Sequence, residues 1–177
     1  MFKKLAAVTA VVLGSVAAPV LVAQTAAAAP TATDTGKFCS IRAETQKMVC
    51  VATEAEMPQA RALAAGNTAA RGDVTPMAVV IVGKLYDNAN YDESAGYLEV
   101  QSNALCTSTR TDVNVSLGTL GSWDNRISSF KAFANCGAKL FENTYFGGSA
   151  YPGSGFYVQS SNVGVAMNDR ASSVQFS

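Results

Sequence analysis

The chain has 177 residues, with 13 basic and 13 acidic side chains and no histidine. This balanced charge gives no electrostatic reason to expect nucleic acid or an anionic membrane as a partner. The absence of histidine excludes Ser-His-Asp and Cys-His nucleophile systems and removes a usual zinc ligand. We therefore expect a protein that is not an enzyme.

Residues 1–28 have the features of a secretory signal peptide. Lys3 and Lys4 precede a long apolar run that ends in a string of small residues, an order typical of exported proteins. We expect cleavage after Ala28, which leaves 149 residues with 11 basic and 13 acidic side chains. An uncleaved membrane anchor is the alternative, and the glycine and proline within the run argue against it. We therefore expect a secreted, extracellular protein with no membrane attachment after cleavage.

All four cysteines follow the signal peptide. An even number of cysteines in an exported chain indicates two disulfides. Three pairings are compatible with the sequence. We expect Cys39–Cys50 and Cys106–Cys136, because short loops close most readily. A metal site on cysteines is disfavoured, since the chain has neither a C-x-x-C pair nor a histidine.

Residues 29–78 differ in composition from the rest of the mature chain, and we interpret them as an N-terminal extension. Residues 37–53 have two apolar clusters around a polar centre, which predicts a hairpin closed by its two cysteines. Residues 53–72 are rich in alanine and glutamate. They predict a short helix with a proline in its first turn and a glycine at its end. A pro-segment and a partner-binding element are the alternatives to a simple extension.

From Met77 onward, short β-branched or aromatic runs alternate with clusters of Gly, Asn, Asp and Ser, at a spacing expected of an antiparallel sandwich. This part is internally duplicated, and each half ends in a segment with two Asx residues, an arginine and a pair of serines. Two homologous halves predict an all-β sandwich of two Greek-key motifs over residues 79–177. The paired segments are 85–103 with 140–162, and "WDNRISSFK" at 123–131 with "MNDRASSVQ" at 167–175.

These repeats resemble the motif of the βγ-crystallins. That motif has two aromatic residues separated by four positions, a glycine two residues later, and then two Asx, two variable residues, Ser/Thr and Ser. The second half matches throughout, whereas the first half has Glu93 at the position of the glycine. Because the glycine normally permits a positive φ, we expect a rearranged first hairpin that uses Gly96. The matching residues are Tyr86, Tyr91, Phe141, Phe146 and Gly148.

The resemblance implies calcium binding, because Asx- and serine-rich loops of this kind bind calcium in βγ-crystallins. Calcium takes six to eight oxygen ligands, and each family site adds a backbone carbonyl from the aromatic hairpin of the other motif. The implied sets are Asp124, Asn125 and Ser128 with the carbonyl of Glu142, and Asn168, Asp169 and Ser172 with the carbonyl of Asp87. The alternative is that the loops hold only their own backbone through Asx- and Ser-turns.

The resemblance also implies a partner. Secreted, disulfide-bonded proteins with a single domain of this type are similar to a family of metalloprotease inhibitors that has the βγ-crystallin fold. This implies inhibition of an extracellular protease by a loop within residues 104–118, stiffened by Cys106–Cys136. The alternative is an extracellular calcium-binding stability module without inhibitory activity. In both cases we expect a monomer.

Overall fold

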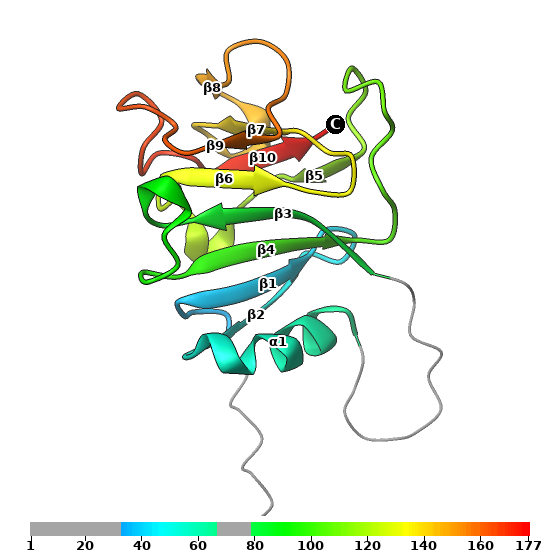
Figure 1. The fold of residues 1–177 in the computed structure, drawn as a ribbon, viewed down its shortest axis with the longest axis vertical. Coiled ribbons are helices and arrows are strands. Elements are labelled where there is room, and N and C mark those ends of the chain that lie inside the picture. The colour runs from blue at the N-terminus through cyan, green and yellow to red at the C-terminus, as the bar shows by residue number, and fades with distance from the viewer. Residues whose placement is uncertain (1–32, 67–78) are drawn as a thin grey trace, which may run out of the picture.

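A computed structural model describes residues 33–66 and 79–177 of the chain, and it places two β-sheets face to face (Figure 1). The expected signal peptide lies outside the described residues. One sheet has the strand order β2-β1-β4-β3-β6-β9, and the other has the order β5-β10-β7-β8. The strands are β1 (Phe38–Arg42), β2 (Lys47–Val51), β3 (Val80–Tyr86), β4 (Tyr97–Ser102), β5 (Val115–Leu117), β6 (Ser129–Ala132), β7 (Ala138–Phe141), β8 (Ala150–Tyr151), β9 (Gln159–Ser160) and β10 (Ser173–Phe176).

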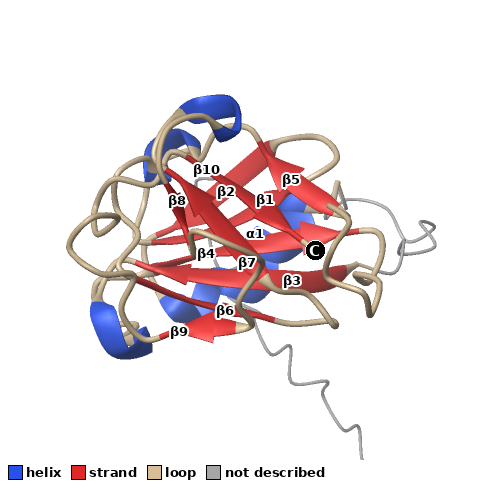
Figure 2. Ribbon diagram, turned by 90° about the horizontal axis from the view of Figure 1, so that it is seen from above, coloured by secondary structure: helices blue, strands red, loops and turns tan. Residues whose placement is uncertain are grey.

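The two halves of the duplicated region form two Greek-key motifs, which confirms the expected fold class. The first motif comprises β3 to β6 and the second comprises β7 to β10. Each motif places three strands in one sheet and exchanges the remaining strand, β5 or β9, with the other sheet. The chain therefore folds as a βγ-crystallin-like sandwich. Figure 2 shows the stacked sheets from above, with loops and short helices around their rim.

The main hydrophobic core lies between the sheets. It contains large, fully buried side chains from both motifs, and Trp123 is among them. Burial of each such side chain stabilises the fold by about 1.5–3 kcal/mol. The sheets approach closely at Gly83, where an added Cβ atom would lie 2.3 Å from the ring of Phe176. A glycine is therefore required at this position of β3.

The N-terminal hairpin and helix are both present, as expected. Strands β1 and β2 pair antiparallel with Cys39 opposite Cys50, and both expected disulfides, Cys39–Cys50 and Cys106–Cys136, are formed. The helix α1 (Met57–Ala64) packs against this hairpin over a second buried cluster. Strand β1 also pairs in parallel with β4. The hairpin therefore extends the first sheet and adds two strands to the sandwich.

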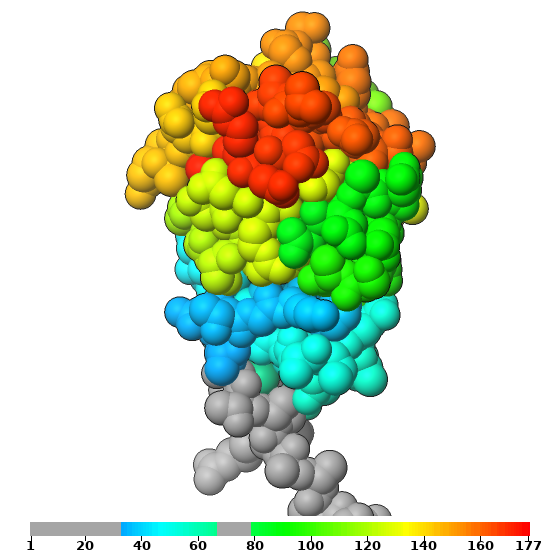
Figure 3. All heavy atoms as spheres, turned by 90° about the vertical axis from the view of Figure 1, so that its left-hand side faces the viewer, coloured from blue at the N-terminus to red at the C-terminus, as the bar shows by residue number. Residues whose placement is uncertain are grey.

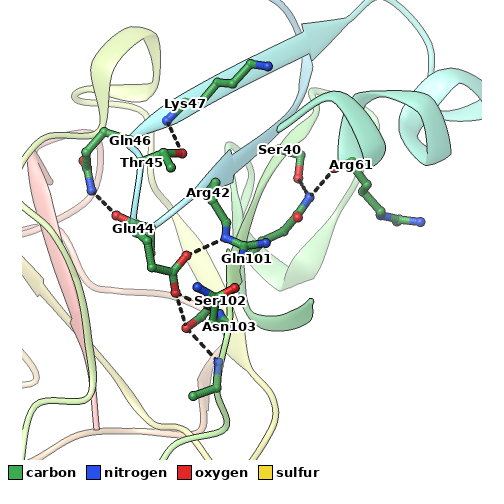
Figure 4. A network of polar contacts seen from close by, with 12 residues as sticks. Ser40, Arg42, Glu44, Thr45, Gln46, Lys47, Arg61, Gln101, Ser102 and Asn103 are labelled. Atoms are coloured by element: carbon green, nitrogen blue, oxygen red, sulfur yellow. Dashed lines mark hydrogen bonds and ion pairs between the residues drawn. The ribbon is translucent and has the colours of Figure 1, made fainter. Parts of the chain in front are cut away.

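A polar layer joins the hairpin, α1 and β4 (Figure 4). The Gln101 side-chain amide donates to Ser40 Oγ at 2.5 Å and to the Arg61 carbonyl at 3.1 Å. Glu99 is only 2 % exposed and accepts two hydrogen bonds from the Arg61 guanidinium, at 2.5 and 2.7 Å. These contacts satisfy the polar side chains that the parallel pairing buries. No helix in the described parts of the chain is long and apolar enough to cross a membrane.

Candidate metal centre

Each motif contains a folded aromatic hairpin after its first strand. In the first motif the rings of Tyr86 and Tyr91 meet edge to face at 5.8 Å, and in the second Phe141 and Phe146 meet at 5.6 Å. A short 3-10 turn closes each hairpin, η2 (Ala89–Tyr91) in the first and η4 (Thr144–Phe146) in the second. The two hairpins are therefore related by the pseudo-twofold axis between the motifs.

The first hairpin is rearranged as expected at the position of the missing glycine. In the second hairpin Gly148 has a φ of 74°, whereas in the first Gly96 has a φ of 111°. The Asp87 amide donates to the Gly96 carbonyl at 3.4 Å. Glu93, at the position of the missing glycine, forms an ion pair in which its carboxylate lies 2.5 Å from Lys84 Nζ. Gly96 thus supplies the left-handed residue, and Glu93 contributes an ion pair.

The second serine of each serine-pair loop (residues 124–129 and 168–173) has a structural role. Ser129 Oγ donates to the Asn88 carbonyl at 2.6 Å and accepts from the Tyr91 amide at 3.1 Å. Ser173 Oγ makes the same two bonds to the second hairpin, with distances of 2.7 and 3.0 Å. Both serines are fully buried. They fasten the hairpins to β6 and β10 and are not available to an ion.

The first serine of each pair is attached to the hairpin of its own motif. The Ser128 amide donates to the Tyr86 carbonyl at 2.9 Å, and the Ser172 amide donates to the Phe141 carbonyl at 2.9 Å. These bonds use the backbone and leave the hydroxyl groups free to meet other oxygens. Ser128 Oγ lies 3.4 Å from Oδ1 of Asp169, which belongs to the other motif.

The two serine-pair loops cross at the pseudo-twofold axis. The Asn125 amide donates to the Ala171 carbonyl at 3.0 Å, and the Asp169 amide donates to the Ile127 carbonyl at 3.2 Å. Asn125 and Asp169 both have a left-handed backbone, with φ of 57° and 55°. In Figure 3 the second loop, in red, lies directly above the first loop, in yellow-green. The Asx turn of one motif is thus held against the serine segment of the other.

This crossing brings together residues that the sequence analysis assigned to different ligand sets. We expected Ser172 to act with Asp169 and the carbonyl of Asp87. The structure instead places Ser128 beside Asp169, and Ser128 is bonded to Tyr86, which directly precedes Asp87. The physical reason is that each serine stays with its own hairpin while the Asx turn crosses the axis. Ser172, in the same way, lies with the hairpin of Glu142.

The remaining loop residues pair with their neighbours. Asn125 Nδ2 donates to the Asp124 carboxylate at 3.0 Å, and Asn168 Nδ2 donates to the Asp169 carboxylate at 2.7 Å. The acidic residue is therefore first in one loop and second in the other. Asp169 therefore places a carboxylate beside Ser128, whereas its equivalent Asn125 has a neutral amide.

Two arginines form ion pairs with carboxylates of the hairpin residues. Arg126 Nη2 binds Asp87 at 2.7 Å, and Arg170 binds Glu142 in the same manner. Hydrogen bonds from Ser149 lower the pKa of Glu142, and Arg170 lowers it further. The ion pairs therefore engage one oxygen of each carboxylate and leave the backbone carbonyls of Asp87 and Glu142 as candidate ligands. The equivalent positions of Arg126 and Arg170 predict a carboxylate partner across the pseudo-twofold axis, whereas the structure pairs each arginine with a carboxylate of its own motif.

The available donors suit a hard cation. In the described residues, no three His, Cys, Asp or Glu side chains gather in a way that could hold a metal ion. A zinc-type site is therefore not supported. Hydroxyl, amide, carboxylate and backbone carbonyl oxygens are the ligands that calcium prefers. The residues at the crossing of the two loops fit calcium on this criterion.

A second exposed feature is the loop of residues 103–114, which we call the disulfide loop. The buried Cys106–Cys136 bond anchors it, and Leu105 and Val113 are exposed on it. Asp112 accepts hydrogen bonds from Thr107 and Thr109 at 2.7–3.0 Å. These bonds, with that of Thr109 foremost, lower the pKa of Asp112 to about 2. The loop is therefore held by its own polar network as well as by a covalent bond.

Comparisons with known proteins returned only solved structures. A scan of protein-family models and a search of curated proteins returned no match. A double mutant of a βγ-crystallin domain from Clostridium beijerinckii is 18% identical and covers 55% of this chain and 97% of its own, with a TM-score of 0.39. A βγ-crystallin domain from Flavobacterium johnsoniae is 20% identical, covering 54% and 93%, with a TM-score of 0.37. The N-terminal domain of protein S is 16% identical, covering 54% and 94%, with a TM-score of 0.38.

Proposed function

We propose that this chain binds calcium between its two motifs and acts as an exported, non-catalytic, calcium-stabilised module. The supporting observation is the distance of 3.4 Å between Ser128 Oγ and Asp169 Oδ1. Two oxygens bound to one calcium ion at right angles, each at about 2.4 Å, are separated by about 3.4 Å. A hydrogen bond from a hydroxyl to a carboxylate is shorter, at about 2.5–2.7 Å. The two oxygens therefore lie within reach of one ion, and without an ion the Ser128 hydroxyl donates a long hydrogen bond to the carboxylate.

The proposed ligands form two sets, and water completes each of them. A bound ion would supply the positive charge that joins a carboxylate of one motif to a hydroxyl of the other. Its binding energy would add directly to the stability of the folded chain. The first set is Ser128, Asp169 and the carbonyl of Asp87, and the second is Ser172, Asn125 and the carbonyl of Glu142. Asp124 and Asn168 would orient their neighbours through the hydrogen bonds already formed.

The thermal midpoint of the mature chain tests this proposal. An ion that binds only the folded form raises the midpoint by mass action, so we expect a higher value in millimolar calcium than in chelator. Asp169→Ala should reduce this calcium-induced shift. Asp112→Ala is the matched control, because it removes an exposed carboxylate from a different loop, and the shift should persist. Equal midpoints of the unmodified chain in calcium and chelator would mean that the loops are purely structural.

The disulfide loop supports a second function, inhibition of an extracellular protease. Its exposed apolar residues are presented on a frame held by Cys106–Cys136 and by Asp112. A loop already ordered before binding loses less conformational entropy in a complex. We would incubate metallo-, serine and cysteine proteases with excess protein, and compare a variant in which residues 107–113 are replaced by a flexible linker, so that Cys106 and β5 are kept. Loss of protease activity with the native loop alone supports inhibition, and unchanged activity of every protease contradicts it.

A further inference from the structure

The N-terminal segment of the described chain lies against the first serine-pair loop. Ser122 Oγ, just before that loop, donates to the Asp34 carbonyl at 2.5 Å. Arg126 Nη1, within the loop, donates to the Gly36 carbonyl at 3.4 Å. Figure 3 shows this segment, in blue, directly below the yellow-green loop. We call residues 33–37, together with the Cys39–Cys50 bond, the N-terminal clamp.

The clamp is fixed at both of its ends. The Cys50 amide donates to the Thr33 carbonyl at 2.8 Å, and the Tyr97 amide donates to the Lys37 carbonyl at 2.9 Å. Between them, a Cβ atom on Gly36 would lie 2.9 Å from Cys50 Cβ. The backbone of the clamp therefore rests directly on the disulfide. The expected cleavage after Ala28 would keep all of these residues in the mature chain.

Arg126 connects the clamp to the proposed ion site. The guanidinium that contacts Gly36 also binds the Asp87 carboxylate at 2.7 Å and lies 4.0 Å from the centre of the Trp123 ring. Asp87 supplies the carbonyl of the first proposed ligand set. Arg170, the counterpart in the second motif, has a side chain 52% exposed, compared with 28% for Arg126. The two motifs therefore hold their arginines to different extents.

We infer that the N-terminal clamp positions Arg126 and the first serine-pair loop, and thereby sets the ion affinity of the site formed by Ser128 and Asp169. This inference rests on the proposed calcium function. An intact clamp preorganises the loop, and it keeps the guanidinium on Asp87. When the clamp is released, the mobile cationic group opposes a second cation nearby. The site of Ser172 takes Asn125 from the same loop but not the carbonyl of Asp87, the residue that Arg126 binds, so it should weaken by a smaller factor.

The test compares variants of the full mature chain. Cys39→Ser with Cys50→Ser removes the covalent part of the clamp, and Ser122→Ala removes one hydrogen bond in a chain that keeps both disulfides. Cys106→Ser with Cys136→Ser is the matched control, because it removes a disulfide away from the clamp. Arg126→Lys keeps the positive charge but loses the planar guanidinium that contacts both Gly36 and Asp87. Its calcium affinity should therefore resemble that of the clamp variants. The measurements are calcium titration by calorimetry and hydrogen exchange of the amides of residues 121–126.

We expect each clamp variant to weaken one of two calcium sites by roughly fivefold or more, and to accelerate exchange at residues 121–126 without calcium. The control should change neither. Unchanged affinity and exchange in both clamp variants would overturn the inference. If the unmodified chain binds no calcium, the proposed function fails and exchange alone decides the positioning role. Faster exchange in the clamp variants then supports it, and unchanged exchange overturns it.

Discussion

Asn125 and Asp169 occupy equivalent positions in the two serine-pair loops but differ in charge. Both have a left-handed backbone, and each amide bonds to the opposite loop. Asp169 presents a carboxylate to Ser128, whereas Asn125 offers only an amide oxygen at the matching place. Calcium affinity rises with the number of charged ligands. The two proposed sites should therefore differ, and the one with Asp169 should be the stronger.

The substitution Asn125→Asp should strengthen the weaker site. It adds a carboxylate where the symmetry places a ligand, and we expect an affinity gain on the order of tenfold, equivalent to about 1.4 kcal/mol. In a calorimetric titration, the binding constant of the weaker site should approach that of the stronger site. Asp112→Asn serves as the control for a general change in surface charge. An unchanged weaker site in Asn125→Asp would contradict its assignment to the set that contains Ser172.

The two serines of each pair should respond differently to mutation. Ser129→Ala leaves the part-buried Tyr91 amide and Asn88 carbonyl without their partner, so the free energy of unfolding should fall by about 1 kcal/mol. Ser128→Ala removes a hydroxyl that makes no short hydrogen bond, and should change stability much less in chelator. Urea denaturation in chelator measures both effects. Equal losses for the two variants would contradict the structural role assigned to Ser129.

The disulfide loop depends on the ionised form of Asp112. Its folded-state pKa is lowered to about 2 from the ordinary value of 3.8, so ionisation favours the ordered loop. The contribution is complete above about pH 4 and is lost as the pH falls towards 2. We expect the difference in thermal midpoint between the native chain and Asp112→Asn to shrink across this range. A difference that stays constant from pH 5 to pH 2 would show that the carboxylate does not hold the loop.

The helix α1 and strand β4 are joined by an ion pair with one buried partner. The side chain of Glu99 is 3% exposed, and that of Arg61 is 38% exposed. Arg61→Met leaves the buried carboxylate unpaired, and we expect a loss of roughly 2–3 kcal/mol in unfolding free energy. Arg61→Met with Glu99→Met should recover most of this loss, since apolar pairs often replace buried ion pairs well. Urea denaturation of the two variants checks this, and a double variant no more stable than the single one would contradict it.

Much of the whole molecule could be predicted from the sequence, because the duplication is visible in it. Matched aromatic residues and serine pairs predict two Greek keys, and the cysteine spacing predicts both disulfides. The parallel pairing of β1 with β4 could not be predicted. The stretch 97–102 alternates apolar and polar residues, which is typical of a strand with one solvent-exposed face. In the structure all six residues are buried, because Arg61 and Ser40 satisfy Glu99 and Gln101 across the chain.

The sequence indicates the types of ligand in the candidate site, and its grouping depends on contacts between distant residues. Asp169 and Ser128 stand 41 positions apart, and nothing local in either loop specifies that they meet. Their proximity follows from the backbone bonds that cross the pseudo-twofold axis. Such an arrangement depends on the packing of two complete motifs. Sequence patterns within one motif therefore identify the ligand types and leave their assignment to a particular ion open.

The exchange of β5 and β9 between the sheets has a mechanical consequence. Each sheet contains a strand from the other motif, so neither half can be pulled away without breaking both sheets. In a single-molecule stretching experiment on the native, oxidised chain, the sandwich should rupture in one event, with no plateau for a half-unfolded species. Two separate rupture events of the sandwich would show that the halves carry load independently. A single rupture would show that the duplicated protein resists tension as one unit, although its sequence consists of two repeats.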